Sequence, residues 1–503
     1  MPEPRVFTVY GMLPEPLGYS LAKFSRSNRA YKDWARDLTS EQSTKFYEDT
    51  AFKYGHNSIK DLAHFAIILE GISQVAAYEM WDSLTDGQES STRYQDWSTR
   101  NFFVPKELAG QKIGDDLVQN SNALVDAYNS FVPSIVDYFR QNKHPPADMD
   151  KDSVERTYKA RSFDVARYLL AMNSYTGLAL FANGRTFEKK IKKLASSPRS
   201  EDRDLAASMK MAIMTNPPFN PVEEKLRESF KDRPDILKEV LGICGFGKSL
   251  SPTLVKYTDS NPFITNTRDD FYEIAKSLLT DNPSNYGERS VELFEDVPSE
   301  VDSVTSLLYK NSLLPYGHIK SKVEKLNDGE LKDFLDIANK YRSKHDGLSE
   351  ETESQRLIFD LCIDVGASRD LNRHRNLVNV SQKVSPLLGY DIPCPPNDPK
   401  IVNSFKQEYV NKMEQSKKLA LEIGNINPHL SVYALPMAFR RRMLLKMDHV
   451  ELEYICNDRT SVQGHFSYRN IVYKAYLLFK EKHPLLTEKF RVTDPKIEDF
   501  FKR

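Results

Sequence analysis

The feature that most constrains the fold of this chain is an internal repetition. Residues 160–187 and 434–461 each contain an arginine followed sixteen positions later by Asn-x-Arg-Thr. In the first segment Arg167 precedes Asn183, and in the second Arg441 precedes Asn457. Because self-similarity of this kind is the mark of a duplicated architecture, we expect two related domains.

We place the division near residue 285. Repeat one covers 1–285, with a polar tail and linker at 196–289, and repeat two covers 290–503. Short strand patterns, VFTVY at residue 6 and VELF at residue 291, open the two repeats. Segments 61–81 and 353–371 carry apolar residues at three- and four-residue spacing, which predicts helices. The expected class is α+β, helix-rich, with small mixed or antiparallel sheets.

Composition excludes several classes of protein. The formal net charge is -1, so no global field directs the chain to nucleic acid or membrane. No apolar stretch approaches the roughly 20 residues that span a bilayer, and no secretory signal is visible. Four scattered cysteines without CxxC spacing favour a reducing compartment and argue against a zinc site. These features predict a soluble cytoplasmic protein.

The tripeptide Arg373-His374-Arg375 is the main candidate for chemistry. Arginine presents five donors in a rigid fork that suits phosphate or carboxylate, and histidine adds a flat ring with a switchable proton. A basic run is more often a solvated surface than a site. The cluster therefore indicates either a basic turn or the binding site of a large anionic ligand.

The order of motifs resembles the flavin-dependent thymidylate synthase family. Residues 54–73, YGHNSIKDLAHFAIILEGIS, are similar to its Gly-His-x-Ser segment and the Gly-Ile-Ser-like turn that follows. Residues 89–95, ESSTRYQ, resemble its Ser-x-Arg-Tyr loop, and the Arg-His-Arg and Asn-x-Arg-Thr elements complete the pattern. The resemblance extends over most of the chain twice and implies a tandem-duplicated member.

Each repeat lacks what the other keeps. In repeat one the Arg-His-Arg position falls on Asp82-Ser83-Leu84, and in repeat two the Ser-x-Arg-Tyr position falls near 383–386. In this family the active sites lie between subunits, with these two motifs supplied by different protomers. The resemblance therefore implies composite sites between the repeats and a homodimer that imitates the family's tetramer.

The resemblance also implies roles for particular residues. FAD would be the cofactor, NADPH and methylenetetrahydrofolate the co-substrates, and dUMP the substrate, with no metal. The FAD-binding candidates are Arg373, His374, Arg375, Asn457, Arg459, Asn183 and Arg185. The nucleotide-binding candidates are Glu89, Ser90, Ser91, Arg93 and Arg167. The catalytic candidates are Arg469, which would polarise the uracil, and His56, whose counterpart in repeat two is at best His345.

Some positions depart from the family pattern. The glutamine three residues before Arg-His-Arg is Asp370 in repeat two and Glu79 in repeat one. Because a carboxylate only accepts hydrogen bonds, base recognition can differ. Hydroxymethylation of a pyrimidine nucleotide and a non-catalytic nucleotide-binding scaffold therefore remain alternatives. Residues 242–249 also match the phosphate-loop pattern GxxxxGKS, but a charged, helix-like segment precedes them and Pro252 follows, which argues against a phosphate loop.

Overall fold

The computed structural model describes residues 9, 11–24, 31, 38–49, 57–99, 101–217, 220–243, 246–295, 300–341, 357–447, 449–482 and 490–502. The chain folds into two compact units. Unit one comprises residues 1–69, 84–88 and 179–261, and unit two comprises 70–83, 89–178 and 262–503. His56 and His345 lie outside the described residues. Of the strand expected at residues 6–10, only residue 9 is described.

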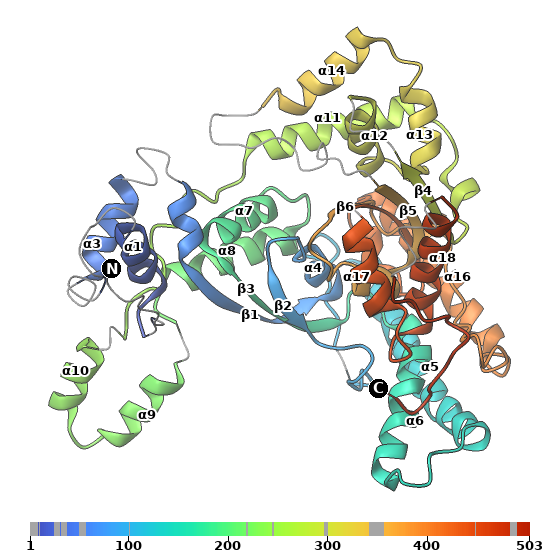
Figure 1. Cartoon of the computed structure of the whole chain (residues 1–503), viewed down its shortest axis with the longest axis horizontal. Coiled ribbons are helices and arrows are strands. Elements are labelled where there is room, and N and C mark those ends of the chain that lie inside the picture. Colours follow the sequence, from blue (N-terminus) through green and yellow to red (C-terminus); the bar gives the residue numbers. More distant parts are fainter. Residues whose placement is uncertain are drawn as a thin grey trace, which may run out of the picture. The chain divides into compact units, whose positions relative to one another are not determined.

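The first part of the chain combines helices of different lengths with a three-stranded sheet (Figure 1). The sheet has the order β1-β3-β2, with β1 His64–Ser73, β2 Asp86–Glu89 and β3 Tyr175–Asn183. The accompanying helices are α1 Pro14–Phe24, α3 Ser40–Phe46, η2 Asn57–Leu62, α4 Gln74–Glu79, α5 Lys112–Asn142, α6 Lys151–Ala166, η3 Arg167–Leu169, α7 Gly184–Ala195, α8 Ser200–Met214, α9 Pro221–Ser229 and α10 Pro234–Ile243.

The second part is built on a four-stranded antiparallel sheet of order β4-β5-β7-β6. Its strands are β4 Ser290–Glu295, β5 Leu357–Asp364, β6 Val378–Ser381 and β7 Arg440–Met447. Its helices are α11 Pro262–Leu278, η4 Pro283–Tyr286, α12 Glu300–Lys310, α13 Tyr316–Val323, α14 Asp328–Asn339, α15 Val365–Leu371, η6 Pro386–Leu388, α16 Lys406–Ile426, η7 Ser431–Ala434, α17 His449–Arg459 and α18 Phe466–Lys482.

Helices cover both faces of the four-stranded sheet. Leu357, Phe359 and Leu361 of β5 pack with residues of α15, α17 and α18. Ile358 packs in a separate cluster with residues of α11, α12, α13 and α14. Every position of β5 is buried, as expected for a strand covered on both faces, and its sequence LIFDLCID is mostly apolar. The α+β class with small antiparallel sheets is confirmed.

Two predicted helices are wrong in their first halves. Residues 64–73 of the segment 61–81 form β1, and residues 357–364 of the segment 353–371 form β5. In β1 the side chains of Phe65, Ile67 and Leu69 are buried alternately with exposed neighbours, which is the period of a strand. In both segments a capping side chain, Ser73 or Asp364, then starts a short helix by accepting a hydrogen bond from the residue three positions on.

The hydrogen bonds of unit two repeat along the chain. The Gln74 N–H donates to the Ser174 carbonyl, and the Val365 N–H donates in the same way to Phe439. Likewise, the Ser90 N–H donates to the Gly177 carbonyl, and the Gln382 N–H donates to Arg442. These four bonds measure 2.9–3.1 Å. The acceptors differ by the same 265 residues in both pairs. The equivalent turns also pair with each other, since Ala171 and Pro436 form an antiparallel bridge. These equal offsets are consistent with a two-repeat arrangement.

The 265-residue offset shows that the expected equivalence of the two Asn-x-Arg-Thr elements is wrong. Asn183 caps the N-terminus of α7 directly after β3, whereas Asn457 lies in the last turn of α17. The 265-residue offset places Asn183 opposite residue 448, nine positions before Asn457, so the two Asn-x-Arg-Thr elements are not equivalent. The caps Ser73 and Asp364 differ by 291 residues, and this offset places Arg373 opposite Asp82.

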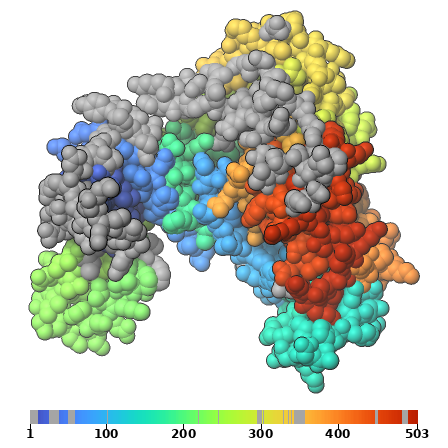
Figure 2. Space-filling view, viewed as in Figure 1, coloured from blue at the N-terminus to red at the C-terminus, as the bar shows by residue number. Residues whose placement is uncertain are grey.

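Long helices of the two repeats form the rest of the core of unit two. Residues of α5, α6 and α16 share one cluster with the turns before β3 and β7. The C-terminal segment lies against the α5–α6 hairpin, as the red and teal surfaces of Figure 2 show. Arg161 of α6 donates to the backbone carbonyls of Asp499, Phe500 and Lys502. Among the described residues, no helix is long and apolar enough to cross a membrane.

Candidate active site

The Ser-x-Arg loop follows β2 and is closed by its own hydrogen bonds. The Ser90 N–H donates to the carbonyl of Gly177 at 2.9 Å. The Ser91 hydroxyl accepts the Arg93 N–H at 3.1 Å, and the Trp97 indole donates to the Ser91 carbonyl at 3.1 Å. The Ser91 carbonyl also accepts the Gln95 N–H at 3.3 Å, so these contacts of Ser91 fix the loop itself.

The Arg93 side chain is buried and extensively bonded. It forms a bidentate ion pair with Asp164 of α6 at 2.7 and 3.0 Å. It also donates to the Tyr468 hydroxyl at 3.2 Å and to the carbonyl of Gln463 at 3.1 Å. Burial opposes its charge, but Asp164 more than offsets this and raises the pKa of Arg93. Four of its five N–H donors are thus committed.

The Arg-His-Arg tripeptide directly follows α15. Arg373 and Arg375 are exposed, while His374 between them is buried. The His374 Nε2 accepts a hydrogen bond from Arg459 at 2.8 Å, and Tyr454 packs edge-on at a ring distance of 5.6 Å. Burial, followed by the charge of Arg459, lowers the pKa of His374 to about 3. This histidine is therefore neutral at pH 7.

Asp370 connects the motifs of the two repeats. Its carboxylate is 8% exposed and accepts a hydrogen bond from Arg167 at 3.2 Å. Burial opposes ionisation, but the charges of Arg167, Arg373, Arg93 and Arg459 together lower the pKa of Asp370 to about 2. Arg93 and Arg167 come from repeat one, and Arg373 and Arg459 come from repeat two. Candidates from both repeats thus lie around one carboxylate.

Arg167 keeps unused donors at this place. Its side chain is 2% exposed, and among the described residues its Nε and Nη2 have no hydrogen-bond partner. Gly366 in the first turn of α15 allows this arrangement, because a Cβ there would lie 3.0 Å from Nη2 of Arg167. Buried guanidinium nitrogens without acceptors are costly in free energy.

Glu89 is not arranged to hold an anion. Its buried carboxylate accepts hydrogen bonds from Arg369 of α15 and, at 3.3 Å, from the Trp81 indole. A carboxylate repels phosphate. The Glu89 side chain instead links the end of β2 to α15, the helix that precedes Arg-His-Arg.

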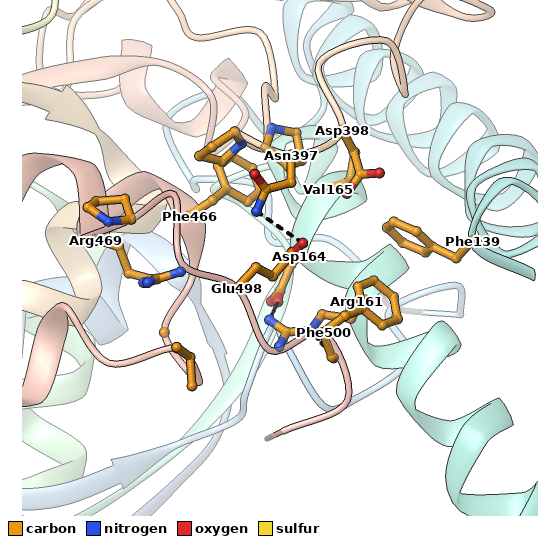
Figure 3. Close-up of a pocket in the computed structure, with 15 residues that line it drawn as sticks. Phe139, Arg161, Asp164, Val165, Asn397, Asp398, Phe466, Arg469, Glu498 and Phe500 are labelled. Atoms are coloured by element: carbon orange, nitrogen blue, oxygen red, sulfur yellow. Dashed lines mark hydrogen bonds and ion pairs between the residues drawn. The ribbon is translucent and has the colours of Figure 1, made fainter. Parts of the chain in front are cut away.

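Arg469 borders a small cavity of about 40 Å³, which Asp164 and Arg161 also line (Figure 3). Its guanidinium donates to the carbonyls of Thr460 at 2.9 Å, Ile497 at 2.9 Å and Asp494 at 3.3 Å. Burial lowers the pKa of Arg469. Backbone carbonyls therefore occupy the guanidinium, and the cavity is much smaller than the roughly 300–1,000 Å³ of a typical ligand pocket.

The remaining candidates lie elsewhere or have other partners. Asn183 and Arg185 belong to unit one, where Asn183 caps α7 and Arg185 pairs with Asp61 at 2.8 Å. Asn457 is exposed on α17. The second Asn-x-Arg element contacts the Arg-His-Arg segment through Arg459, which donates to His374, and through the Asp458 carboxylate, 4.0 Å from the His374 Nε2.

Two further residues, His318 and Asp164, were not among the candidates predicted from the sequence. The tripeptide Tyr-Gly-His of residues 54–56 recurs at Tyr316-Gly317-His318, so His318 is a better counterpart of His56 than His345. In α13 the ring of His318 contacts the Tyr286 hydroxyl at 3.0 Å and Asp281 at 2.7 Å. Asp164 was also missed, because no motif surrounds it and only the fold brings it to Arg93.

Together these features define an α+β protein in which arginines from both halves of the chain act on the buried carboxylate of Asp370. The chain belongs to the thymidylate synthase complementing protein family, whose model matches residues 12–218 and 302–485. Two matched segments are consistent with the tandem arrangement.

The chain is similar to other proteins of known sequence and to solved structures. A UPF0159 protein of Chlamydia muridarum is 23% identical over 451 residues, covering 86% of this chain and 78% of that protein. A UPF0159 protein of Thermoplasma acidophilum is 24% identical over 490 residues, covering 90% and 89%. The crystal structure of thymidylate synthase X from Helicobacter pylori with FAD and dUMP is 15% identical, with a TM-score of 0.23, and covers 39% of this chain and 88% of that one.

Proposed function

We propose that this protein is a flavin-dependent thymidylate synthase-like enzyme that transfers a folate-borne one-carbon unit reductively to C5 of dUMP. The observation that carries the proposal is the gathering of Arg93 and Arg167 with Arg373 and Arg459 around Asp370. Family membership supports the same chemistry. The site would be composite, with one copy per chain, and two chains would form a homodimer in the cytoplasm.

The Arg-His-Arg residues fit the flavin. Arg373 is exposed, and among the described residues it has no hydrogen-bond partner, so its fork is available for a phosphate of FAD. Neutral His374 is fixed by Arg459 and cannot add a charge that would vary near pH 7. When bound, the flavin would supply the hydride, with NADPH as its reductant and methylenetetrahydrofolate as the carbon donor.

The nucleotide side of the site rests on Arg167. Its buried Nε and Nη2 offer two donors to an oxygen of the substrate, while the acceptor Asp370 lies beside it. A donor next to an acceptor complements an imide-like edge, in which a carbonyl adjoins an N–H. The protein's contribution would be to orient the pyrimidine and stabilise its developing negative charge in a site from which water is excluded.

A non-catalytic nucleotide-binding scaffold is the second candidate. The observation in its favour is that Arg93 is neutralised by Asp164 and Arg469 is held by backbone carbonyls. Both residues would have to exchange partners before they could contact a substrate. Hydroxymethylation of a pyrimidine nucleotide would use the same site and differ in product.

Two measurements test the proposal. Purified protein incubated with FAD should retain flavin absorbance after gel filtration, and tritium should be released from C5-labelled dUMP in the presence of methylenetetrahydrofolate and NADPH. Mass analysis of the product distinguishes a methyl from a hydroxymethyl group. Protein that takes up no FAD would contradict the enzyme proposal, whereas FAD and dUMP binding without tritium release would support the scaffold.

A further inference from the structure

Unit one contains a cavity that the flavin site does not use. Its volume is about 270 Å³. It is bordered by the start of α1, by α3 and by the segment that carries the Gly-Lys-Ser end of the GxxxxGKS pattern. The lining residues are Glu15, Pro16, Ser40, Glu41, Thr44, Lys248, Ser249 and Pro252.

The structure gives this segment none of the features of a phosphate loop. Helix α10 precedes it where a phosphate loop needs a strand, and the described stretch 246–261 contains no helix after the lysine and serine. The Lys248 ammonium lies 3.5 Å from the carboxylate of Glu41. A phosphate entering here would therefore find its cation already paired.

Glu15 gives the cavity a buried negative charge. The residue is 2% exposed. Its Oε1 accepts from the Thr253 N–H at 2.8 Å, the Ser251 hydroxyl at 3.1 Å, the Leu254 N–H at 3.3 Å and the Thr253 hydroxyl. Among the described residues, no hydrogen bond reaches Oε2 and no cation pairs with this carboxylate. The second oxygen of this buried carboxylate thus has no hydrogen-bond donor among the described residues, and Glu15 borders the cavity.

Burial of an unpaired carboxylate is expensive, and the burial of Glu15 raises its pKa. A cationic ligand that donates a hydrogen bond to Oε2 would recover this cost. An anion would increase it. The electrostatics of the cavity therefore oppose phosphate and favour a positively charged occupant.

We propose that this cavity binds a small organic ammonium ion, with the Glu15 carboxylate as its counter-ion. The three N–H donors of an ammonium group can be shared between Oε2 and the hydroxyls of Ser40, Thr44 and Ser249. The rings of Pro16 and Pro252 give an apolar wall for the carbon chain. The cavity is far larger than the roughly 30 Å³ of a single water, and the described residues contain no cluster of three metal-ligating side chains.

Ligand-observed NMR titration of the full chain with propylammonium chloride, at constant ionic strength, tests the proposal. Glu15→Gln should weaken binding by at least about tenfold, since hydrogen bonds to charged groups contribute roughly 1.5–3 kcal/mol. The matched control Glu228→Gln, on the exposed side of α9, should leave binding unchanged. Lys248→Ala removes a competing cation and should leave affinity equal or higher.

Glu15→Gln can affect folding, so a second variant is included. Ser249→Lys places a tethered ammonium at the cavity and should abolish propylammonium binding while the melting temperature stays within a few degrees of wild type. Absence of propylammonium binding to wild type, unchanged binding in Glu15→Gln or Ser249→Lys, or tight binding of inorganic phosphate that Lys248→Ala abolishes would each overturn the proposal.

Discussion

Replacing Asp370 by asparagine should destabilise unit two measurably. The four arginines around this carboxylate lower its pKa to about 2 from an ordinary value of 3.8. Each unit of pKa corresponds to about 1.4 kcal/mol, so the charge contributes about 2 kcal/mol to the free energy of unfolding at pH 7. Because the pKa is lowered on folding, this stability is present above about pH 4 and is lost as the pH falls toward 2.

Asparagine preserves the shape and one acceptor, so the variant removes mainly the charge. Urea unfolding followed by the fluorescence of Trp97, which is fully buried in the same unit, reports the change. The control Asp259→Asn removes a carboxylate that is 89% exposed and should cost less than about 0.5 kcal/mol. Equal unfolding curves for Asp370→Asn and the control would show that the arginines do not depend on this carboxylate.

Three further outcomes follow from the geometry of the site. Because the pKa of His374 is about 3, protonation favours the unfolded chain, and wild type should lose up to about 2 kcal/mol more than His374→Gln between pH 6.5 and 5; superimposable pH profiles would refute this. Gly366→Ala should push the facing buried guanidinium aside and weaken dUMP binding several-fold, whereas Gly242→Ala, with open space around it, should not; isothermal titration distinguishes them. Arg93→Ala combined with Asp164→Ala, which avoids leaving a buried charge unpaired, should weaken dUMP binding while FAD stays bound, and simultaneous loss of FAD would contradict the assignment.

The sequence predicted the class of the fold better than its local structure. In residues 61–81, apolar residues at both two- and three-residue spacing were interpreted as a helix, although Phe65, Ile67 and Leu69 follow the period of a strand. In residues 353–371, β5 is buried on both faces and has no period to detect. Chain pairing across the sheet decides such segments, and that is not a local property.

Part of the candidate site could be predicted from the sequence, and part could not. Because each repeat keeps one of the two motifs, around Arg93 and Arg373, the sequence predicts that they share a site, and the charges of both arginines act on the carboxylate of Asp370. The partner Asp164 could not be predicted, since it lies in a helix without a motif and reaches Arg93 only through the packing of α6. The surroundings of Arg469 depend on where the last residues of the chain dock, and the motif carries no information on that.

The most direct test of the composite site compares FAD retention in two variants at equivalent positions of the repeats. Arg373→Ala removes the exposed guanidinium after α15, and Asp82→Ala changes its counterpart in repeat one. After saturation with FAD and gel filtration, Arg373→Ala should elute without flavin absorbance, and Asp82→Ala should retain as much flavin as wild type. Equal loss in both variants, or retention in Arg373→Ala, would contradict a site in which only repeat two binds the flavin.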